Sequence, residues 1–309
     1  MTINKLDTKA FALALLDTYN FNGYGIDKEV AIKELQREIE EDFIDLNTEE
    51  TKLARWQRFK REGVSLQDFS EKVLNLGESR KVIYGIRHMN GNINIPFINL
   101  IANFSISSKE DALEIYKNIC DEFKNFSPKF LSFFSAQKIE ADFYGDTYMC
   151  ATASTMKARD PWNSEAEIDL IRVEDESYYA WYEKGYAQFN KDVPELAYKV
   201  RANSREVMNE SLDEELLYYA FYQGRRIGLI AAVRSKLLGH DGFYFNEIYL
   251  EKEFKGKGLA KALQRIFVAK FASDNPIVWG TIDASNLPSY KTAFSNGRRP
   301  IRFECFVKL

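Results

Sequence analysis

The chain has 309 residues, of which 45% are hydrophobic and 28% are charged. This composition is typical of a globular protein and excludes an intrinsically disordered chain. The formal net charge of -4 gives no reason to expect a nucleic acid partner, because such partners require a basic surface. The length favours two domains over one.

The sequence gives little support for a membrane-spanning segment or a metal site. The apolar run AFALALL is too short to span a membrane, and no cationic segment with a cleavage site precedes it. We therefore expect a cytoplasmic protein that does not bind membranes. The widely spaced Cys120, Cys150 and Cys305 fit neither a disulfide framework nor a zinc site. With two distant histidines in addition, we expect no metal.

Residues 1–155 are predicted to form an N-terminal domain in two parts. Residues 1–78 are expected to be helical, because DKEVAIKELQREIEEDFIDL spaces its apolar residues as one helix face does. Residues 80–155 are expected to form a small α/β unit. Its β-β-α-β order suggests a half-copy of the arrangement in the second half, and it shows no chemistry of its own.

Local signals support the α/β unit. Asn90-Gly91 lies between two strand-like runs and predicts a hairpin. Ser107, with Glu110 three residues later, resembles a capping box that opens a helix.

The polar stretch 156–166 is the expected domain boundary, and residues 167–309 are expected to form the second domain. Its hydrophobic runs predict the order β, α, α, β, β, β, α, β, α, β. A hairpin turn is expected at Gln223-Gly224. The fold class is therefore mixed α/β (α+β), with a central sheet that is mixed but mostly antiparallel.

A glycine-rich loop in the second domain, within EFKGKGLAKALQ, joins a strand to a helix. Backbone N–H groups at a helix N-terminus lack intrahelical partners, and Gly256 and Gly258 allow the backbone to approach an anion closely. The spacing fits neither the P-loop, which needs Gly-Lys-Ser/Thr, nor the dinucleotide fingerprint, whose third glycine is replaced by Lys261. Cations are expected around the same end of the helix from Lys255, Lys257, Lys261 and Arg265. The loop therefore predicts a phosphate-sized ligand.

The segment KGKGLA resembles the [RQ]-x-x-G-x-[GA] loop of the GNAT superfamily, the acyl-CoA-dependent N-acyltransferases. Lys255 stands where Arg or Gln is usual, and Gly258 and Ala260 match. The later stretch NLPSYKTAFSNG resembles the next motif of that family, through Asn286 and Ser289. The resemblance covers roughly residues 167–309 and implies a GNAT-like fold there.

This resemblance implies acetyl-CoA, or another acyl-CoA, as the acyl donor and an amine as the acceptor. The family pattern implies that the pantetheine arm pairs with the main chain of Ile248, Tyr249 and Leu250. It implies that the pyrophosphate rests on the amides of Lys255, Gly256, Lys257, Gly258, Leu259 and Ala260. Asn286 and Ser289 would touch the cofactor or order the transfer site.

Glu247 is the candidate general base. An alkyl ammonium has a pKa of about 10.4 and must lose a proton before it attacks a thioester. Neighbouring aromatic residues could raise the pKa of Glu247 by desolvation. Alternatively, Glu247 faces solvent or pairs with an arginine.

The expected general acid is missing. Many relatives have a tyrosine where this chain has Ala293, and an aromatic residue where it has Arg298. A branch of the superfamily that acetylates protein N-termini also has alanine at the first of these positions. The thiolate, with a thiol pKa of about 8.5, can leave without a dedicated acid.

The sequence thus predicts an N-acetyltransferase that moves an acetyl or short acyl group to a primary amine. Two alternatives stay open: a weak or inactive CoA-binding module for sensing or protein interaction, and an interaction protein whose loop holds no ligand. The aromatic segment ESYYAWYEKGYAQF could line the acceptor pocket or belong to the core. The acceptor, the acyl chain length and the role of residues 1–155 are not predicted, and a homodimer is possible.

Overall fold

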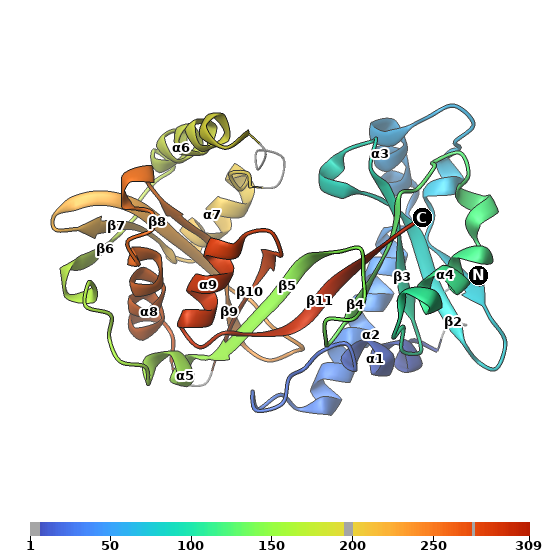
Figure 1. The fold of residues 1–309 in the computed structure, drawn as a ribbon, viewed down its shortest axis with the longest axis horizontal. Coiled ribbons are helices and arrows are strands. Elements are labelled where there is room, and N and C mark those ends of the chain that lie inside the picture. Colours follow the sequence, from blue (N-terminus) through green and yellow to red (C-terminus); the bar gives the residue numbers. More distant parts are fainter. Residues whose placement is uncertain (1–6, 195–199, 274–275) are drawn as a thin grey trace. The chain divides into compact units, whose positions relative to one another are not determined.

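A computed structural model describes residues 7–194, 200–273 and 276–309 (Figure 1). The chain forms two compact units: Met1–Thr147 with Ile301–Leu309, and Tyr148–Pro300. The chain passes between them inside two strands, β5 (Phe143–Thr152) and β11 (Arg299–Lys308). The sequence placed the boundary at 156–166 and residues 301–309 in the second domain. The prediction rested on the polar stretch, which interrupts the hydrophobic pattern. A chain that crosses between units inside a strand does not interrupt that pattern.

The first unit combines three N-terminal helices with a sheet and one further helix. Its helices are α1 (Thr8–Leu16), α2 (Lys28–Asp45), α3 (Glu49–Phe59) and α4 (Lys109–Lys117). Its strands, besides parts of β5 and β11, are β1 (Lys72–Asn75), β2 (Lys81–His88), β3 (Pro96–Ala102) and β4 (Phe130–Ser135). The strand order is β1-β2-β3-β4-β11. The short β1 lies in the segment that was predicted to be helical. A strand of 4 residues is too short to show a clear alternation of apolar and polar side chains.

The predicted turns of the first unit are correct in kind and shifted in detail. The hairpin between β2 and β3 forms, with Asn90 at φ 52° and Gly91 at φ 69°. The capping box of α4 uses Ser108 and Asp111, one residue later than predicted.

The second unit contains most of the predicted second domain, and residues 168–308 have the element order that the sequence predicts. Its helices are α5 (Ala153–Lys157), α6 (Tyr178–Asp192), α7 (Arg205–Asp213), α8 (Leu259–Phe271) and α9 (Leu287–Ser295). Its further strands are β6 (Ile168–Arg172), β7 (Leu217–Tyr222), β8 (Arg225–Arg234), β9 (Gly242–Leu250) and β10 (Ile277–Asp283). The strand order is β5-β10-β9-β8-β7-β6. Gln223 and Gly224 form the expected turn, both with positive φ.

Helices cover both faces of the second unit's sheet, as the strand side chains show. Ile230 and Ala232 of β8 pack in one cluster with α8, whereas Leu229 and Ala231 pack in another with α6 and α7 (Figure 1). Alternation along a strand sends successive side chains to opposite faces. The sheet of the second unit therefore has one face covered by α8 and another covered by α6 and α7, and the candidate site lies on the latter. Among the described residues, no helix is long and apolar enough to cross a membrane.

The two units share an arrangement of strands and one helix. In each, an antiparallel hairpin (β2-β3 or β8-β9) leads through a helix (α4 or α8) to a strand parallel to its second member (β4 or β10). The parallel register covers residues 97–99 with 130–132 in the first unit and 242–244 with 277–279 in the second. In both units the two parallel strands continue beyond the paired residues. The half-copy suggested by the sequence thus has a counterpart in the topology.

The assignment of β11 to the first unit gives a test. Val307 is fully buried in a core with side chains of β3 and β4. We expect Val307→Ala to lower the free energy of unfolding by about 1–3 kcal/mol, because it removes buried methyl groups and leaves a cavity. Amide hydrogen exchange should then accelerate in β3 and β4. Faster exchange appearing first in β8 and β9 would contradict the assignment.

Candidate functional site

A bulge in β9 determines where Glu247 points. Ala231 of β8 lies opposite Glu247, but the next residue, Ala232, lies opposite Phe245, so Asn246 is an extra residue in β9. Regular alternation would place Glu247 on the same face as Phe245, toward α8. The extra residue reverses this, and Glu247 lies instead on the face covered by α6.

Hydrogen bonds from α7 and the segment before it hold the bulge. The side-chain amide of Asn246 donates to Ser211 Oγ at 2.9 Å and to the carbonyl oxygen of Val207 at 3.3 Å. The side-chain amide of Asn203 donates to the carbonyl oxygen of Asn246 at 2.8 Å. A bulge leaves main-chain groups without ladder partners, so the bond to the Asn246 carbonyl removes a cost that burial would otherwise impose, and the other two bonds fix the Asn246 side chain.

Two tyrosine hydroxyls from α6 converge on the carboxylate of Glu247. Tyr182 donates to Oε2 at 2.5 Å and Tyr186 donates to the same oxygen at 2.8 Å. Burial raises the pKa of Glu247, while these hydrogen bonds and the charge of Lys255 act in the opposite direction. A carboxyl with a raised pKa is a better proton acceptor from an amine than an ordinary one is.

A glycine in α6 allows this close packing. A Cβ at Gly185 would lie 1.8 Å from the hydroxyl oxygen of Tyr249. Tyr249 also packs against Tyr182 and Tyr186, with ring centroids 5.6 Å apart in each pair. Glu247 is half-buried beside these rings, and among the described residues its side-chain partners are the two tyrosine hydroxyls and not an arginine.

The predicted loop has the geometry of an anion site. Gly256 and Gly258 have φ of 77° and 76°, and Gly258 is the N-cap residue of α8 without a side-chain cap. Within the described part of the chain, the N–H groups of residues 256–260 have no hydrogen-bond acceptor. Such N–H groups at the positive end of a helix dipole favour a phosphate. Burial lowers the pKa of Lys255, whose ammonium lies 4.4 Å from the ring centroid of Phe189.

Other cations expected near this loop have structural partners. Arg265 is buried and pairs with Glu165 at 2.6 Å, so it does not stand beside the loop as a phosphate ligand. The ammonium of Lys261 lies 3.6 Å from the ring centroid of Trp162.

The second predicted motif lies at the start of α9. Asn286 is the N-cap residue of α9, and its Oδ1 accepts from the N–H of Ser289 at 3.3 Å. This bond explains the spacing of the two residues as a helix cap. Their contact with a cofactor stays a prediction.

The two departures from the family pattern have structural explanations. Ala293 is 1% exposed, so a tyrosine would not fit there without rearrangement. Arg298 is buried and donates to the carbonyl oxygens of Met149 and Gly280 at 3.1 and 3.2 Å. Burial lowers the pKa of Arg298 to about 10.

The aromatic segment of α6 belongs in part to the core, which is one of the two roles that the sequence left open, and its place in an acceptor pocket stays a prediction. Tyr178, Tyr179 and Tyr182 are buried in the core with α7 and β9. Tyr186 is only partly buried and contacts Glu247. No sequence pattern indicates a role for Asn203 or Asn246. The contacts of both residues depend on the bulge, which is not visible in the alternation of a single strand.

The loop before α4 in the first unit corresponds to the loop before α8, but it lacks the glycines and the free N–H groups that favour an anion. Residues 103–108 contain no glycine. The carboxylate of Asp111 accepts from the N–H groups of Ser107 and Ser108 at 2.9 and 3.1 Å. The protein's own carboxylate therefore occupies the helix N-terminus in the first unit.

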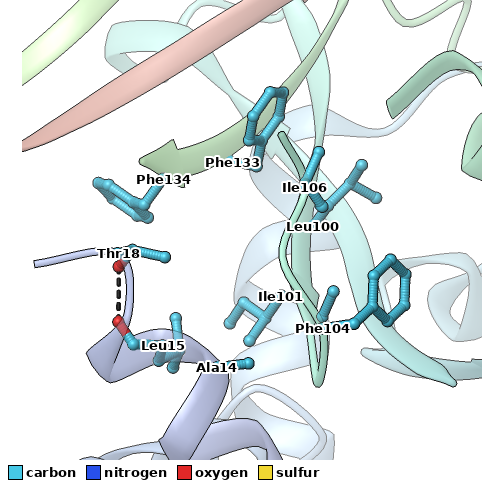
Figure 2. Close-up of a pocket in the computed structure, with 10 residues that line it drawn as sticks. Ala14, Leu15, Thr18, Leu100, Ile101, Phe104, Ile106, Phe133 and Phe134 are labelled. Atoms are coloured by element: carbon cyan, nitrogen blue, oxygen red, sulfur yellow. Dashed lines mark hydrogen bonds between the residues drawn. The ribbon is translucent and has the colours of Figure 1, made fainter. Parts of the chain in front are cut away.

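In the first unit, apolar side chains lie where β3 and β4 separate beyond their paired residues. Figure 2 shows a small cavity lined by residues of β3 and β4 beyond their paired register, by Phe104 and Ile106, and by α1 and the residues after it. The lining residues are Ala14, Leu15, Thr18, Leu100, Ile101, Ala102, Phe104, Ile106, Phe133 and Phe134. Side chains of α1 thus pack against the place where the strands separate.

Comparison with known proteins gives similarity in structure but not in sequence. No protein-family model and no curated protein sequence matches the chain. A GCN5-related N-acetyltransferase from Sphaerobacter thermophilus is similar, with a TM-score of 0.53 and 10% identity, over 97% of this chain and 91% of that one. A GNAT-family acetyltransferase from Colwellia psychrerythraea has a TM-score of 0.49 and 8% identity, over 84% and 96%. Arabidopsis thaliana Naa50 in complex with the bisubstrate analogue CoA-Ac-MVNAL has a TM-score of 0.33 and 13% identity, over 46% and 99%.

The raised pKa of Glu247 predicts a pH-dependent stability. The folded protein holds this proton more tightly than the unfolded chain does. The free energy of unfolding therefore falls as pH rises from the ordinary glutamate pKa, about 4.3, through the folded-state value. Glu247→Gln abolishes this titration, so its stability relative to the wild type should increase as pH rises from about 4 through the folded-state pKa of Glu247.

Urea unfolding at several pH values measures this difference. Glu183→Gln is the control, because Glu183 is an exposed carboxylate of α6 and follows Tyr182 directly in sequence. A constant difference for Glu247→Gln across the pH range would contradict the raised pKa.

Proposed function

We propose that this chain, which has the fold of the GCN5-related N-acetyltransferases, is an enzyme that transfers an acetyl or short acyl group from acyl-CoA to a primary amine. The fold agrees with the superfamily resemblance in the sequence. The proposal is carried by two features that occur together: Glu247 on β9, held by tyrosine hydroxyls, and the uncapped amides of the loop that follows β9.

The cofactor would extend from this loop along β9. The pyrophosphate would rest on the N–H groups of residues 256–260, with the side chains of Lys255 and Lys257 nearby. The N–H of Lys255, which the sequence prediction included, donates instead to the carbonyl oxygen of Lys252 at 3.2 Å. Within the described residues, the pairing of β9 with β10 ends at Tyr244. Beyond that point the edge of β9 can pair with the amides of a pantetheine arm, as an added strand would. Ile248, Tyr249 and Leu250 supply that edge.

The reaction requires little from the protein besides position and one proton acceptor. Glu247 takes a proton from the ammonium or the attacking amine, and the amine nitrogen bonds to the thioester carbonyl carbon. When the tetrahedral intermediate collapses, the carbon–sulfur bond breaks and CoA leaves as a thiolate. With a thiol pKa of about 8.5, the thiolate is a good leaving group, consistent with alanine at position 293.

A second candidate is a CoA-binding module without transfer activity. The buried Ala293 favours it, because no hydroxyl stands where many relatives have a general acid. The carboxylate of Glu247 and its hydroxyl partners favour the enzyme, because a module that only bound CoA would not need a proton acceptor at this position. The cytoplasmic location and the possible homodimer stay predictions from the sequence.

The anion site can be tested with a matched pair of substitutions. Gly256 and Gly224 have φ of 77° and 76°, and a Cβ at either would meet nothing within 4 Å. Gly256→Asp places a carboxylate at the proposed pyrophosphate site, and we expect at least about tenfold weaker CoA binding, about 1.4 kcal/mol. Gly224→Asp adds the same charge in the β7–β8 turn and should bind CoA as the wild type does. Calorimetric titration measures both, and equal weakening by the two would contradict the site.

The same titration should give one CoA per chain, not two. The first unit has a similar strand and helix arrangement, but Asp111 already caps its helix. Two equivalent sites per chain would contradict this reasoning.

Transfer itself is tested by following thiol release from acetyl-CoA with a panel of small amines and peptides. We expect Glu247→Gln to lower kcat by about 10²–10⁴-fold while CoA still binds, because the variant loses the proton acceptor but not the loop. CoA binding by the wild type without thiol release from any amine would favour the second candidate. No CoA binding at all would favour an interaction protein.

A further inference from the structure

Tyr182 differs from its neighbours in having a hydroxyl with a fixed direction. Its ring is fully buried, and its oxygen accepts the main-chain N–H of Asn203 at 2.9 Å. An amide N–H can only donate, so the phenol hydrogen of Tyr182 must go elsewhere. Its acceptor is Oε2 of Glu247, at 2.5 Å, which carries negative charge and is therefore a stronger acceptor than the nearby hydroxyl of Tyr186.

Asn203 connects this hydroxyl to the bulge. Its main chain fixes the Tyr182 oxygen, and its side-chain amide donates to the carbonyl oxygen of Asn246, which directly precedes Glu247. One residue thus sets the position of the hydroxyl and of the backbone that carries the carboxylate. A connected and satisfied network of this kind restricts a side chain more than a single bond does.

We propose that Tyr182 is a positioning residue of the acyl transfer: its hydroxyl, directed by Asn203, holds Oε2 of Glu247 so that Oε1 receives the proton of the amine. The chemical part of this inference rests on the function proposed above. Among the described residues, the side-chain hydrogen bonds to this carboxylate both end on Oε2, from Tyr182 and Tyr186. The amine proton moves to Oε1, and the tyrosines keep their own protons throughout.

Removing the hydroxyl should change the titration of Glu247 in a known direction. The titratable groups that face the carboxylate are Tyr182 and Tyr186 from α6, Tyr249 from β9 and Lys255 from the loop, and the main-chain N–H of Ile248 also donates to it. A donor to a carboxylate favours its ionised form, so losing the donor raises the pKa. Tyr182→Phe should therefore raise the pKa of Glu247 by about one unit.

Tyr178→Phe is the matched control. Tyr178 lies on the same helix and is 1% exposed, and among the described residues its hydroxyl has no hydrogen-bond partner. This variant removes the same atom from a similar environment without touching Glu247. It should leave the titration of Glu247 unchanged.

The experiment combines a spectroscopic and a kinetic readout. Carbon-13 NMR of side-chain-labelled glutamate, with the Glu247 resonance assigned by its loss in Glu247→Gln, follows the titration directly. In Tyr182→Phe we expect the acidic limb of the kcat profile to move to higher pH with the NMR titration. We also expect kcat near neutral pH to fall about tenfold with KM for acetyl-CoA unchanged, because the cofactor loop is not altered.

Each outcome decides a different point. No shift of the Glu247 resonance in Tyr182→Phe, or an equal shift in Tyr178→Phe, would overturn the positioning role. If Tyr182→Phe does not fold, Tyr186→Phe removes the other donor and should shift the resonance in the same direction; no shift there would overturn the shared-oxygen geometry. A shifted resonance in a protein that accepts no amine would retain the geometry and reject the proposed function.

Discussion

The bulge at Asn246 is the constraint on which the candidate site depends. A strand of strict alternation would send Glu247 toward α8, into a cluster of leucine and phenylalanine side chains, where an ionised carboxylate has no partner. The extra residue turns it to the face where α6 offers two hydroxyls. The side chain of Asn203 donates to the carbonyl oxygen of Asn246 there, and α7 holds the Asn246 side chain. Fold and chemistry are therefore decided at the same residue.

The site also explains why two demands on Glu247 can be met together. Burial among aromatic rings makes the carboxylate more basic, and two hydroxyls keep it ionisable in spite of that burial. Without the rings the group would be an ordinary surface acid, and without the hydroxyls it would hold its proton too firmly. The loop before α8 meets a simpler demand, because uncapped amides and glycines in the left-handed region are enough for an anion.

Much of this could be predicted from the sequence, and the remainder has a physical reason. The element order of residues 168–308 follows from hydrophobic period, and the loop at Gly256 and Gly258 follows from its local motif. Glu247 became a candidate through the superfamily resemblance. The bulge could not be foreseen, since a residue inserted in one strand is visible only against its partner strand. The unit boundary was missed because the chain crosses inside β5 and β11, where the alternating pattern is unbroken. Arg265 appeared to be a phosphate ligand from its position, but its partner Glu165 is remote in sequence.

The place of Ile301–Leu309 in the first unit has a consequence for biosynthesis. Phe303, Cys305 and Val307 belong to the core built by β2, β3 and β4. A ribosome therefore completes Met1–Thr147 long before the strand that pairs with β4 has been translated. Until then the nascent first unit has an open sheet edge and an incomplete core, and a fragment that stops near residue 147 would keep both defects permanently.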